Sequence, residues 1–434
     1  MKQSTLATFC LLINLLAATS LRAQPTKPAT NPFTGEQLFK DVQTYVAFGE
    51  HRTGTEADGK TAEWLKSTLA AAGFTTSYQD FPLNQYFHER ASLRLGDQSV
   101  EVFPAWPVPS ALPSTTEARL VDSGTEKDSS RYRNAIVLTR LAYWGGASFN
   151  KAYISQLNRL INAGSKAVVA ITEGSTQEII ALNAPSVLKP WTVPVVLAAP
   201  KDSARLLTHA RATTPAILQL AGNVRTGVTA RNVIGRLGTG DKFVVVSTPI
   251  SGWFTCGGER GPGVALFNAF AKWVGAQKLP YQFIFVATSG HEIGGLGMHA
   301  FMHSLAPKPD QVHLWLHLGA GLATVAWQKT PQGWQAQPRA DSLRYLMYSE
   351  NLQESAQRLF ASVAIQKVLV KGEAVGELDL IMRKGYPSFY GIAAGHRFHH
   401  TRQDDARKTS PALLAEIAKP LQGVMAQYLS TGTR

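Results

Sequence analysis

The most constraining feature of the sequence is the alternation of strands and helices in its second half. Phe283 to Ala287 is continuously apolar, which is typical of a strand buried on both faces of a parallel sheet. Val264 to Val274 before it carries apolar residues on one helical face, and His313 to Leu318 after it predicts another strand. Pro411 to Leu429 predicts a closing helix. This alternation predicts an α/β fold, with a mostly parallel sheet and helices on both faces.

The length and composition of the chain suit a large globular protein. It has 434 residues, of which 44% are apolar and 17% charged, and this balance excludes disordered, collagenous and fibrous proteins. A single core rarely grows beyond about 300 residues, so we expect two domains, or one domain with a large insert. The net charge of +13 is spread along the chain without a Lys/Arg block, and we expect no nucleic-acid partner.

The first 23 residues have the pattern of a secretory signal peptide. Lys2 provides a positive start, Leu6 to Ala18 is apolar, and a small-residue cleavage site follows at Ala23. This apolar run is short for a membrane span and no later run is long enough, so we expect no transmembrane segment. We therefore predict an exported protein, periplasmic or secreted. Cys10 would leave with the signal peptide, and the mature chain would keep only Cys256 and no disulfide.

A change in the residue pattern indicates an insert within the α/β pattern. Residues 86–229 hold short β-rich pieces separated by Pro, Gly and Ser, whereas residues 35–85 and 230–434 belong to the α/β part. Residues 24–34 are rich in Pro, Thr and Asn, which is typical of a linker. We therefore predict a signal peptide at 1–23, a linker, a split α/β domain and one inserted β-rich domain.

Polar residues that suit a zinc site gather in the second half of the chain. In open α/β sheets, sites form at the carboxyl ends of strands, and zinc prefers histidine, cysteine and carboxylate ligands. His291 and Glu292 closely follow the strand Phe283 to Ala287, and His317 lies at the end of the next strand. The other candidates lie in a Gly-rich loop and in a late cluster, and they are Cys256, Glu259, Arg260, His399, His400, Asp404 and Asp405.

Several of these residues also have a simpler structural explanation. Isolated histidines are more often satisfied polar groups than ligands, which we expect for His299, His303 and His313. A lone cysteine in an exported protein is usually a buried apolar residue. Nothing in the sequence indicates a lowered pKa for Cys256, so a nucleophilic Cys256 with a histidine as its base is an alternative, not the main interpretation.

Short motifs along the chain occur in the order found in one known family. Arg52 to Thr55 with the helix after it, and Asn232 to Gly235, are two of them. His291 to Gly297 and His400 to Asp404 are two more. Together they resemble the secreted di-zinc aminopeptidases of metallopeptidase family 28, which also contains the animal glutaminyl cyclases. The resemblance covers nearly the whole mature chain and implies the zinc-exopeptidase fold, and the insert at 86–229 resembles a protease-associated domain.

The resemblance also implies that the metal site is altered. The family holds two zinc ions through a His-x-Asp, a bridging Asp, a Glu-Glu pair, an Asp and a late His. The His-x-Asp falls on the segment from Pro249 to Ser251, and proline cannot ligate zinc. We therefore do not expect the two-zinc arrangement, because Pro249 and Ser251 replace residues of the ligand type.

The remaining positions of the family keep oxygen and nitrogen donors. The bridging Asp falls on Glu259 and the late His on His400, while the Glu-Glu pair falls on His291-Glu292 and the next Asp near His317. His291 stands where the family has its general base, and imidazole titrates near neutral pH, so it could take over that role. One zinc ion could be held by four of these residues, which are Glu259, Glu292, His317 and His400.

The sequence favours an exported peptidase-like hydrolase that acts on a peptide, amide or related bond. Two changed ligand positions carry histidine and one keeps a carboxylate, which indicates remodelling and not random loss. A catalytically inactive binding protein of the same fold is the alternative that Pro249 and Ser251 fit best. An ordinary di-zinc aminopeptidase and a cysteine-based hydrolase are further alternatives. The expected partner is a peptide or another small extracellular molecule.

Overall fold

The computed structural model describes residues 31–109, 114–124, 129–142, 148–185 and 188–430. The predicted signal peptide and most of the predicted linker lie outside the described residues. Within the described residues, no helix combines the length and the apolar character that crossing a membrane requires. The predicted strand and helix pattern of the second half can therefore be compared with the structure directly.

The α/β half of the chain contributes seven neighbouring strands to a 13-stranded sheet. They are β7 (Pro215–Leu237), β8 (Phe243–Pro249), β9 (Gln282–Thr288), β10 (Val312–Leu318), β13 (Arg344–Tyr348), β14 (Gln366–Leu369) and β15 (Phe389–Ala394). Their order is β7-β9-β8-β10-β15-β13-β14, and β9, β8, β10 and β15 run parallel to one another. β7 pairs antiparallel with β9, whereas β13 pairs antiparallel with β15 and parallel with β14. This arrangement confirms the predicted α/β fold.

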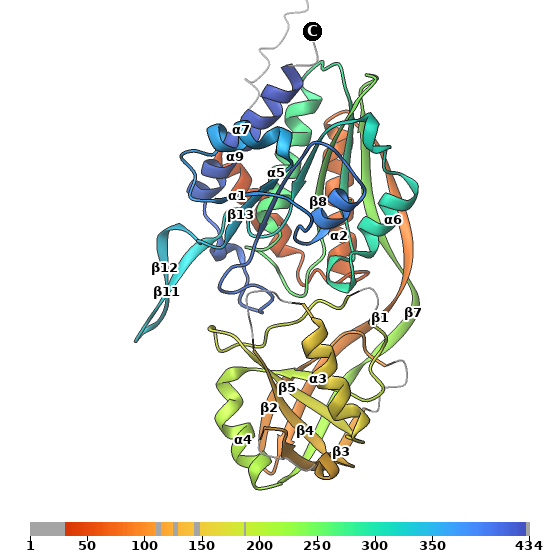
Figure 1. Ribbon diagram of the computed structural model, residues 1–434, viewed down its shortest axis with the longest axis vertical. Coiled ribbons are helices and arrows are strands. Elements are labelled where there is room, and N and C mark those ends of the chain that lie inside the picture. Colours follow the sequence, from red (N-terminus) through yellow and green to blue (C-terminus); the bar gives the residue numbers. More distant parts are fainter. Residues whose placement is uncertain (1–30, 110–113, 125–128, 143–147, 186–187, 431–434) are drawn as a thin grey trace, which may run out of the picture. The chain divides into compact units, whose positions relative to one another are not determined.

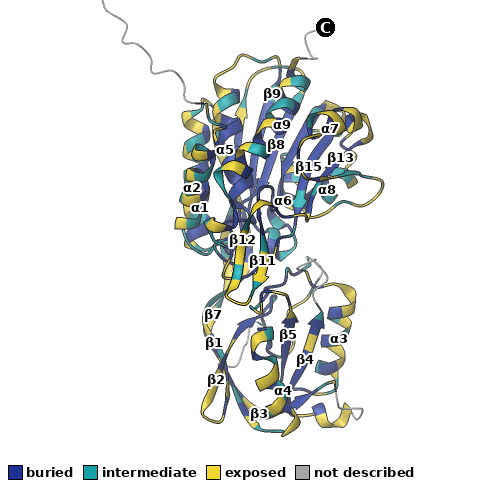
Figure 2. Cartoon of the chain, turned by 90° about the vertical axis from the view of Figure 1, so that its left-hand side faces the viewer, coloured by how far each residue is buried: buried dark blue, intermediate teal, exposed yellow. Residues whose placement is uncertain are grey.

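Helices cover both faces of this part of the sheet (Figure 1), as predicted. One group comprises α1 (Gly35–Ala47), α2 (Glu56–Ala71), α5 (Gly261–Gly275), α7 (Gln353–Leu359) and α9 (Pro411–Ser430), and the other comprises α6 (Leu296–Ser304) and α8 (Glu377–Arg383). Because side chains alternate along a strand, Val244 and Phe285 pack with the first group, whereas Val245 and Ile284 pack with the second. Figure 2 shows these strands buried between the helices.

The segment between β1 and β7 has its own strands and its own cores. It contains β2 (Gln98–Pro104), β3 (Thr115–Asp122), β4 (Ile136–Ala142), β5 (Ala167–Glu173), β6 (Val195–Ala198), α3 (Lys151–Asn162) and α4 (Ser203–Arg211). β3, β4, β5 and β6 are parallel, so the segment is itself partly α/β and not only β-rich. Separate apolar clusters lie around Val168 and around Val169, which are neighbours along β5.

Two long strands join this segment to the rest of the sheet. β1 (Thr75–Leu95) extends well beyond the predicted strand Thr75 to Phe81, and it pairs antiparallel with β7 along nearly its whole length. The predicted boundaries at 85/86 and 229/230 fall inside these two strands. The separation into two domains, and the likeness of residues 86–229 to a protease-associated domain, stay predictions.

The structure also contains elements that the sequence pattern did not predict. A separate two-stranded sheet is formed by β11 (Val325–Thr330) and β12 (Gly333–Ala340), whose side chains are largely exposed. Short 3₁₀ helices occur at Ser129–Tyr132, Pro200–Asp202, His291–Ile293, Pro309–Gln311, Glu350–Leu352 and Ala406–Lys408. The turn His291–Ile293 is the one that shapes the candidate site.

Candidate functional site

Two loops that follow neighbouring parallel strands place the predicted site residues close together. Pro249 at the end of β8 is the register partner of Thr288 at the end of β9, so both loops leave the same edge of the sheet. After β9 the chain enters the 3₁₀ turn His291–Ile293. Gly290 and Gly294 flank this turn with φ of 84° and 86°, a left-handed conformation that glycine adopts without strain.

Arg260 ties the two loops together from a fully buried position. Its Nε donates to the Ser251 carbonyl at 2.9 Å, and its Nη2 lies 2.9 Å from Glu259 Oε1 and 2.8 Å from Glu292 Oε1. Burial opposes the charge on Arg260, but the two carboxylates more than offset this and raise its pKa above its usual value. The site therefore contains a permanent organic cation between two glutamates.

Ser251 completes this arrangement around Glu292. Its hydroxyl donates to Glu292 Oε2 at 2.7 Å and accepts the backbone N–H groups of Gly290 and His291 at 2.9 and 3.2 Å. Both carboxylate oxygens of Glu292 thus have a donor within the protein, Arg260 for one and Ser251 for the other. The position predicted to have lost a zinc ligand is occupied by a hydroxyl that holds the neighbouring glutamate.

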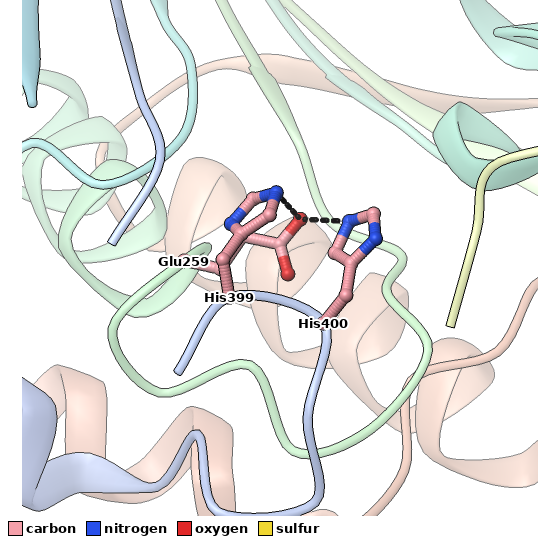
Figure 3. Close-up of side chains that lie close together, drawn as sticks. All are labelled: Glu259, His399 and His400. Carbon is pink, nitrogen blue, oxygen red and sulfur yellow. Dashed lines mark hydrogen bonds and ion pairs between the residues drawn. The ribbon is translucent and has the colours of Figure 1, made fainter. Parts of the chain in front are cut away.

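Glu259 also faces two adjacent histidines (Figure 3). His400 Nε2 lies 3.2 Å from Glu259 Oε1, and His399 Nε2 lies 3.9 Å from the same oxygen. Burial raises the pKa of the Glu259 carboxyl, but Arg260 and the two histidines lower it more, and the net pKa lies well below its usual value. Burial lowers the pKa of His400, but the carboxylate of Glu259 raises it by more, so the net pKa lies above its usual value.

Glu259, His399 and His400 have the composition of a site for one metal ion. Their ligand atoms lie within 4.8 Å of one another, and a carboxylate with two imidazoles is a donor set that zinc accepts. Within the described residues, Glu259 Oε2 and His399 Nδ1 are buried without a hydrogen-bond partner. His400 Nδ1 lies 2.8 Å from the Ala181 carbonyl, which holds hydrogen on Nδ1 and leaves Nε2 as the ligand atom.

The structure separates two of the predicted ligands from this group. Glu292 faces Arg260 and Ser251, and His317 Nδ1 lies 2.9 Å from the hydroxyl of Ser247. That hydroxyl also accepts from the indole of Trp315 at 2.8 Å. Burial lowers the pKa of His317 to about 4, so this imidazole is neutral near pH 7. Of the four predicted ligands, only Glu259 and His400 lie together, and His399 joins them.

His291, the predicted general base, lies against a glutamate that the sequence did not single out. Its Nδ1 is 3.4 Å from Glu377 Oε1, and the Thr288 hydroxyl donates to the same carboxylate, at 3.0 and 2.8 Å from its two oxygens. Burial raises the pKa of Glu377, but His291 and His317 lower it more, and the net pKa is below its usual value. Glu377 begins α8, and no motif in the sequence connected it to the site.

A cavity of about 170 Å³ connects the histidines and the buried charges. Its ionisable lining residues are Glu259, Arg260, His291, His317, Glu377, His399 and His400. A neighbouring hollow of about 390 Å³ shares Ser148, Asn183, His291, Gly376 and Glu377 with it. The side chain of His291 is 16% exposed, whereas that of Glu377 is 2% exposed. The imidazole is therefore the member of this pair that a ligand in the cavity can reach.

Asp404 in the late cluster holds the loop that carries Glu259. Its two carboxylate oxygens accept the backbone N–H groups of Gly258 at 2.7 Å and Glu259 at 3.1 Å. His396 Nε2 lies 3.3 Å from the same carboxylate. Asp404 thus holds the backbone at Glu259. The motif from His400 to Asp404 therefore has a structural role, in addition to providing a histidine to the site.

Cys256 is buried in an apolar cluster behind the same loop. Burial raises the pKa of its thiol well above the usual value, and the nearby carboxylates of Glu259 and Asp404 raise it further. Among the described residues, the structure contains no hydrogen bond between this sulfur and an imidazole. The nucleophilic role considered for Cys256 gains no support from this geometry.

The structure is similar to solved aminopeptidases over almost its full length, although no protein-family model and no curated protein matches the sequence. It matches a zinc aminopeptidase from Bacillus subtilis with a TM-score of 0.70 and 16% identity, covering 91% of this chain and 96% of that one. It matches an aminopeptidase from Aneurinibacillus sp. strain AM-1 with a TM-score of 0.64 and 16% identity, covering 92% and 94%.

A third match is a peptidase precursor of metallopeptidase family 28 from Shewanella amazonensis SB2B. Its TM-score is 0.69 with 15% identity, and the match covers 92% of this chain and 96% of that one. These likenesses place the fold with the zinc exopeptidases, as the sequence motifs implied. At this level of identity they describe the fold, and the chemistry has to be argued from the site itself.

Proposed function

We propose that the chain is an exported hydrolase of the zinc-exopeptidase fold that cleaves a peptide, amide or related bond in the cavity beside His291. The observation that carries this proposal is the pair of His291 and Glu377 at the cavity wall, 3.4 Å apart. A reachable imidazole with a buried carboxylate behind it is the arrangement that general bases use. The likeness of the fold to aminopeptidases supports a peptide or amide as substrate.

In the proposed mechanism, the negative charge of Glu377, 3.4 Å from His291 Nδ1, favours hydrogen on that nitrogen, which leaves Nε2 to accept a proton. A water molecule in the cavity gives this proton to Nε2 as its oxygen attacks the substrate carbonyl. The carboxylate of Glu377 stabilises the imidazolium that forms. His291 then returns the proton from Nε2 to the leaving amine. Thr288 holds Glu377 in place during these steps, because its hydroxyl donates to the carboxylate.

One zinc ion would be held by Glu259, His399 and His400. When bound, it would supply Lewis-acid chemistry to a substrate carbonyl in the cavity that His291 also lines. His400 would lose its proton on binding the ion, so zinc affinity should rise as the pH rises. This single-ion site differs from the two-zinc arrangement of the family.

The test compares hydrolysis by the wild type with that by His291→Ala. The mature chain would be assayed with fluorogenic aminoacyl amides and dipeptides, with and without one equivalent of Zn²⁺. We expect kcat to fall by about 10²–10⁴-fold in His291→Ala. His299→Ala is the matched control, because His299 lines only the neighbouring hollow. Equal rates in the two variants would contradict a general-base role for His291.

A non-catalytic binding protein is the second candidate, and Arg260 favours it. Its guanidinium forms ion pairs with Glu259 and Glu292, two carboxylates that stand at metal-ligand positions of the family. Such a protein would bind peptides in the same cavity without cleaving them. Saturable binding of an N-terminally free tripeptide by calorimetry, with the peptide recovered intact after prolonged incubation, would favour this candidate over the hydrolase.

A further inference from the structure

We propose that Arg260 is a resident cation that replaces a second metal ion, so that the site accepts at most one metal ion. Its guanidinium occupies the position between Glu259 and Glu292 where a shared ion would otherwise bind. The proposal concerns the number of ions that the site can hold. It therefore stands or falls independently of whether the chain cleaves a bond.

The first argument is the electrostatic demand of two buried carboxylates. The side chains of Glu259 and Glu292 are 0% and 4% exposed, and their Oε1 atoms lie within 3 Å of one guanidinium nitrogen. Two carboxylates this close repel each other strongly in a region of low dielectric constant, so the fold needs a cation between them. Arg260 Nη2 supplies that cation from within the chain.

The second argument is that Arg260 is held in place on both sides. Nε donates to the Ser251 carbonyl at 2.9 Å, and Nη2 contacts both glutamates. A metal ion between the glutamates would have to displace this nitrogen and leave a charged side chain buried without its partners, which is costly. At Glu292 it would also compete with the hydroxyl of Ser251.

The third argument is where Arg260 lies in the chain. It is the residue that precedes the first turn of α5, at the helix N-terminus, where the helix dipole disfavours positive charge. The helix therefore gives no reason for a basic residue at this position. The two carboxylates provide that reason, and they offset the unfavourable dipole.

The two carboxylate oxygens of Glu259 have different surroundings, and this difference limits the site to one ion. Oε1 is shared by Arg260 and His400, whereas Oε2 is buried without a hydrogen-bond partner among the described residues. One ion held by Glu259 and the two imidazoles leaves the guanidinium in place, whereas a second ion between Glu259 and Glu292 would have to displace it.

The experiment measures bound zinc per folded chain. Wild type, Arg260→Asn and Arg260→Lys would be dialysed against micromolar Zn²⁺ and analysed by native mass spectrometry, with circular dichroism to verify folding. We expect no more than one ion in the wild type and in Arg260→Lys, and one additional ion in Arg260→Asn. Adding Glu292→Gln to Arg260→Asn should abolish the additional ion, because it removes one of the two carboxylates.

Two results would overturn the proposal. One is a wild type that binds two ions at saturation, which can be measured even if Arg260→Asn does not fold. The other is a folded Arg260→Asn that binds no more zinc than the wild type. An Arg260→Asn chain that folds only when Zn²⁺ is present would support the proposal, because the ion would then perform the role of the guanidinium. None of these readouts depends on catalytic activity.

Discussion

Two groups of charged residues lie a few side chains apart in this protein, and they are built in opposite ways. Around Arg260, two carboxylates and a guanidinium are buried and form ion pairs with one another. Around His291, one carboxylate is buried and its imidazole partner lies at the wall of a cavity. The first group has a buried cation between its two carboxylates, while the second presents an imidazole to a ligand that enters the cavity.

This difference separates residues that fix the structure of the site from residues that take part in the proposed reaction. A buried ion group of this kind contributes mainly by fixing the two loops to each other, and removing one member leaves a buried charge. A pair with one member at a cavity wall can contact a ligand without any unfolding of the chain. The predictions below test this division, beginning with the largest expected effect on stability.

Removal of the guanidinium should have the largest effect. Arg260→Met keeps much of the side-chain volume but leaves Glu259 and Glu292 buried without their cation, and we expect a loss of about 3–5 kcal/mol in the free energy of unfolding. Urea denaturation in the presence of a chelator would measure it. Arg383→Met is the matched control, because Arg383 pairs with Asp379 at the surface, where the loss of an ion pair costs little stability. Equal losses would contradict the division.

A buried carboxyl that contacts the loop after β9 should make the free energy of unfolding depend on pH. Asp58 Oδ2 accepts from the Ser289 hydroxyl and the Gly54 N–H, and burial raises its pKa to about 7. The folded state therefore keeps a proton that the unfolded chain releases near pH 4, so this contribution to stability is full at acid pH. It declines as the pH rises from about 4 and is lost above about 7.

Asp58→Asn should remove this dependence. We expect the difference in unfolding free energy between pH 5 and pH 8 to change by about 2–4 kcal/mol relative to the wild type. Chemical denaturation at a series of pH values measures it. Asp80→Asn provides a control, since the side chain of Asp80 is 54% exposed. A profile unchanged by Asp58→Asn would mean that this carboxyl is ionised throughout the range.

Loss of the charge behind His291 should affect the reaction and leave stability nearly unchanged. Glu377→Gln keeps the shape of the side chain and its contact with Thr288, but it no longer stabilises a protonated imidazole. We expect kcat to fall by about 10–10²-fold with a small change in KM. Steady-state kinetics on a substrate found with the wild type would measure this split. A change confined to KM would indicate that Glu377 contributes to binding only.

The fold could be predicted because its central strands carry an unambiguous pattern. Strands such as Phe283 to Ala287 are apolar throughout since both faces are covered, and that pattern does not depend on distant residues. β11 and β12 were not predicted, because exposed glutamines and basic residues give them no apolar periodicity. β1 was predicted to end at Phe81, because Pro82 and polar residues such as Asn84 and His88 interrupt the apolar pattern of the part that follows.

The candidate site was predicted less completely than the fold. Motif order located Glu259, His291 and His400 on loops that do meet in space. It did not predict that Arg260 points between two glutamates, because the direction of a long side chain depends on partners far away in the sequence. Glu377 was missed for a related reason, as only the placement of α8 beside β9 brings it to His291.

The contacts of Ala181 connect residues 86–229 with the loops of the site. The Ala181 carbonyl accepts from His400 Nδ1, its N–H donates to the His400 carbonyl, and the N–H of Ala184 donates to the Glu292 carbonyl. Residues 86–229 thus provide part of the scaffold for both site loops. A shortened chain without them would lose the orientation of its histidine as well as a neighbouring surface, so the two parts of this protein have to change together.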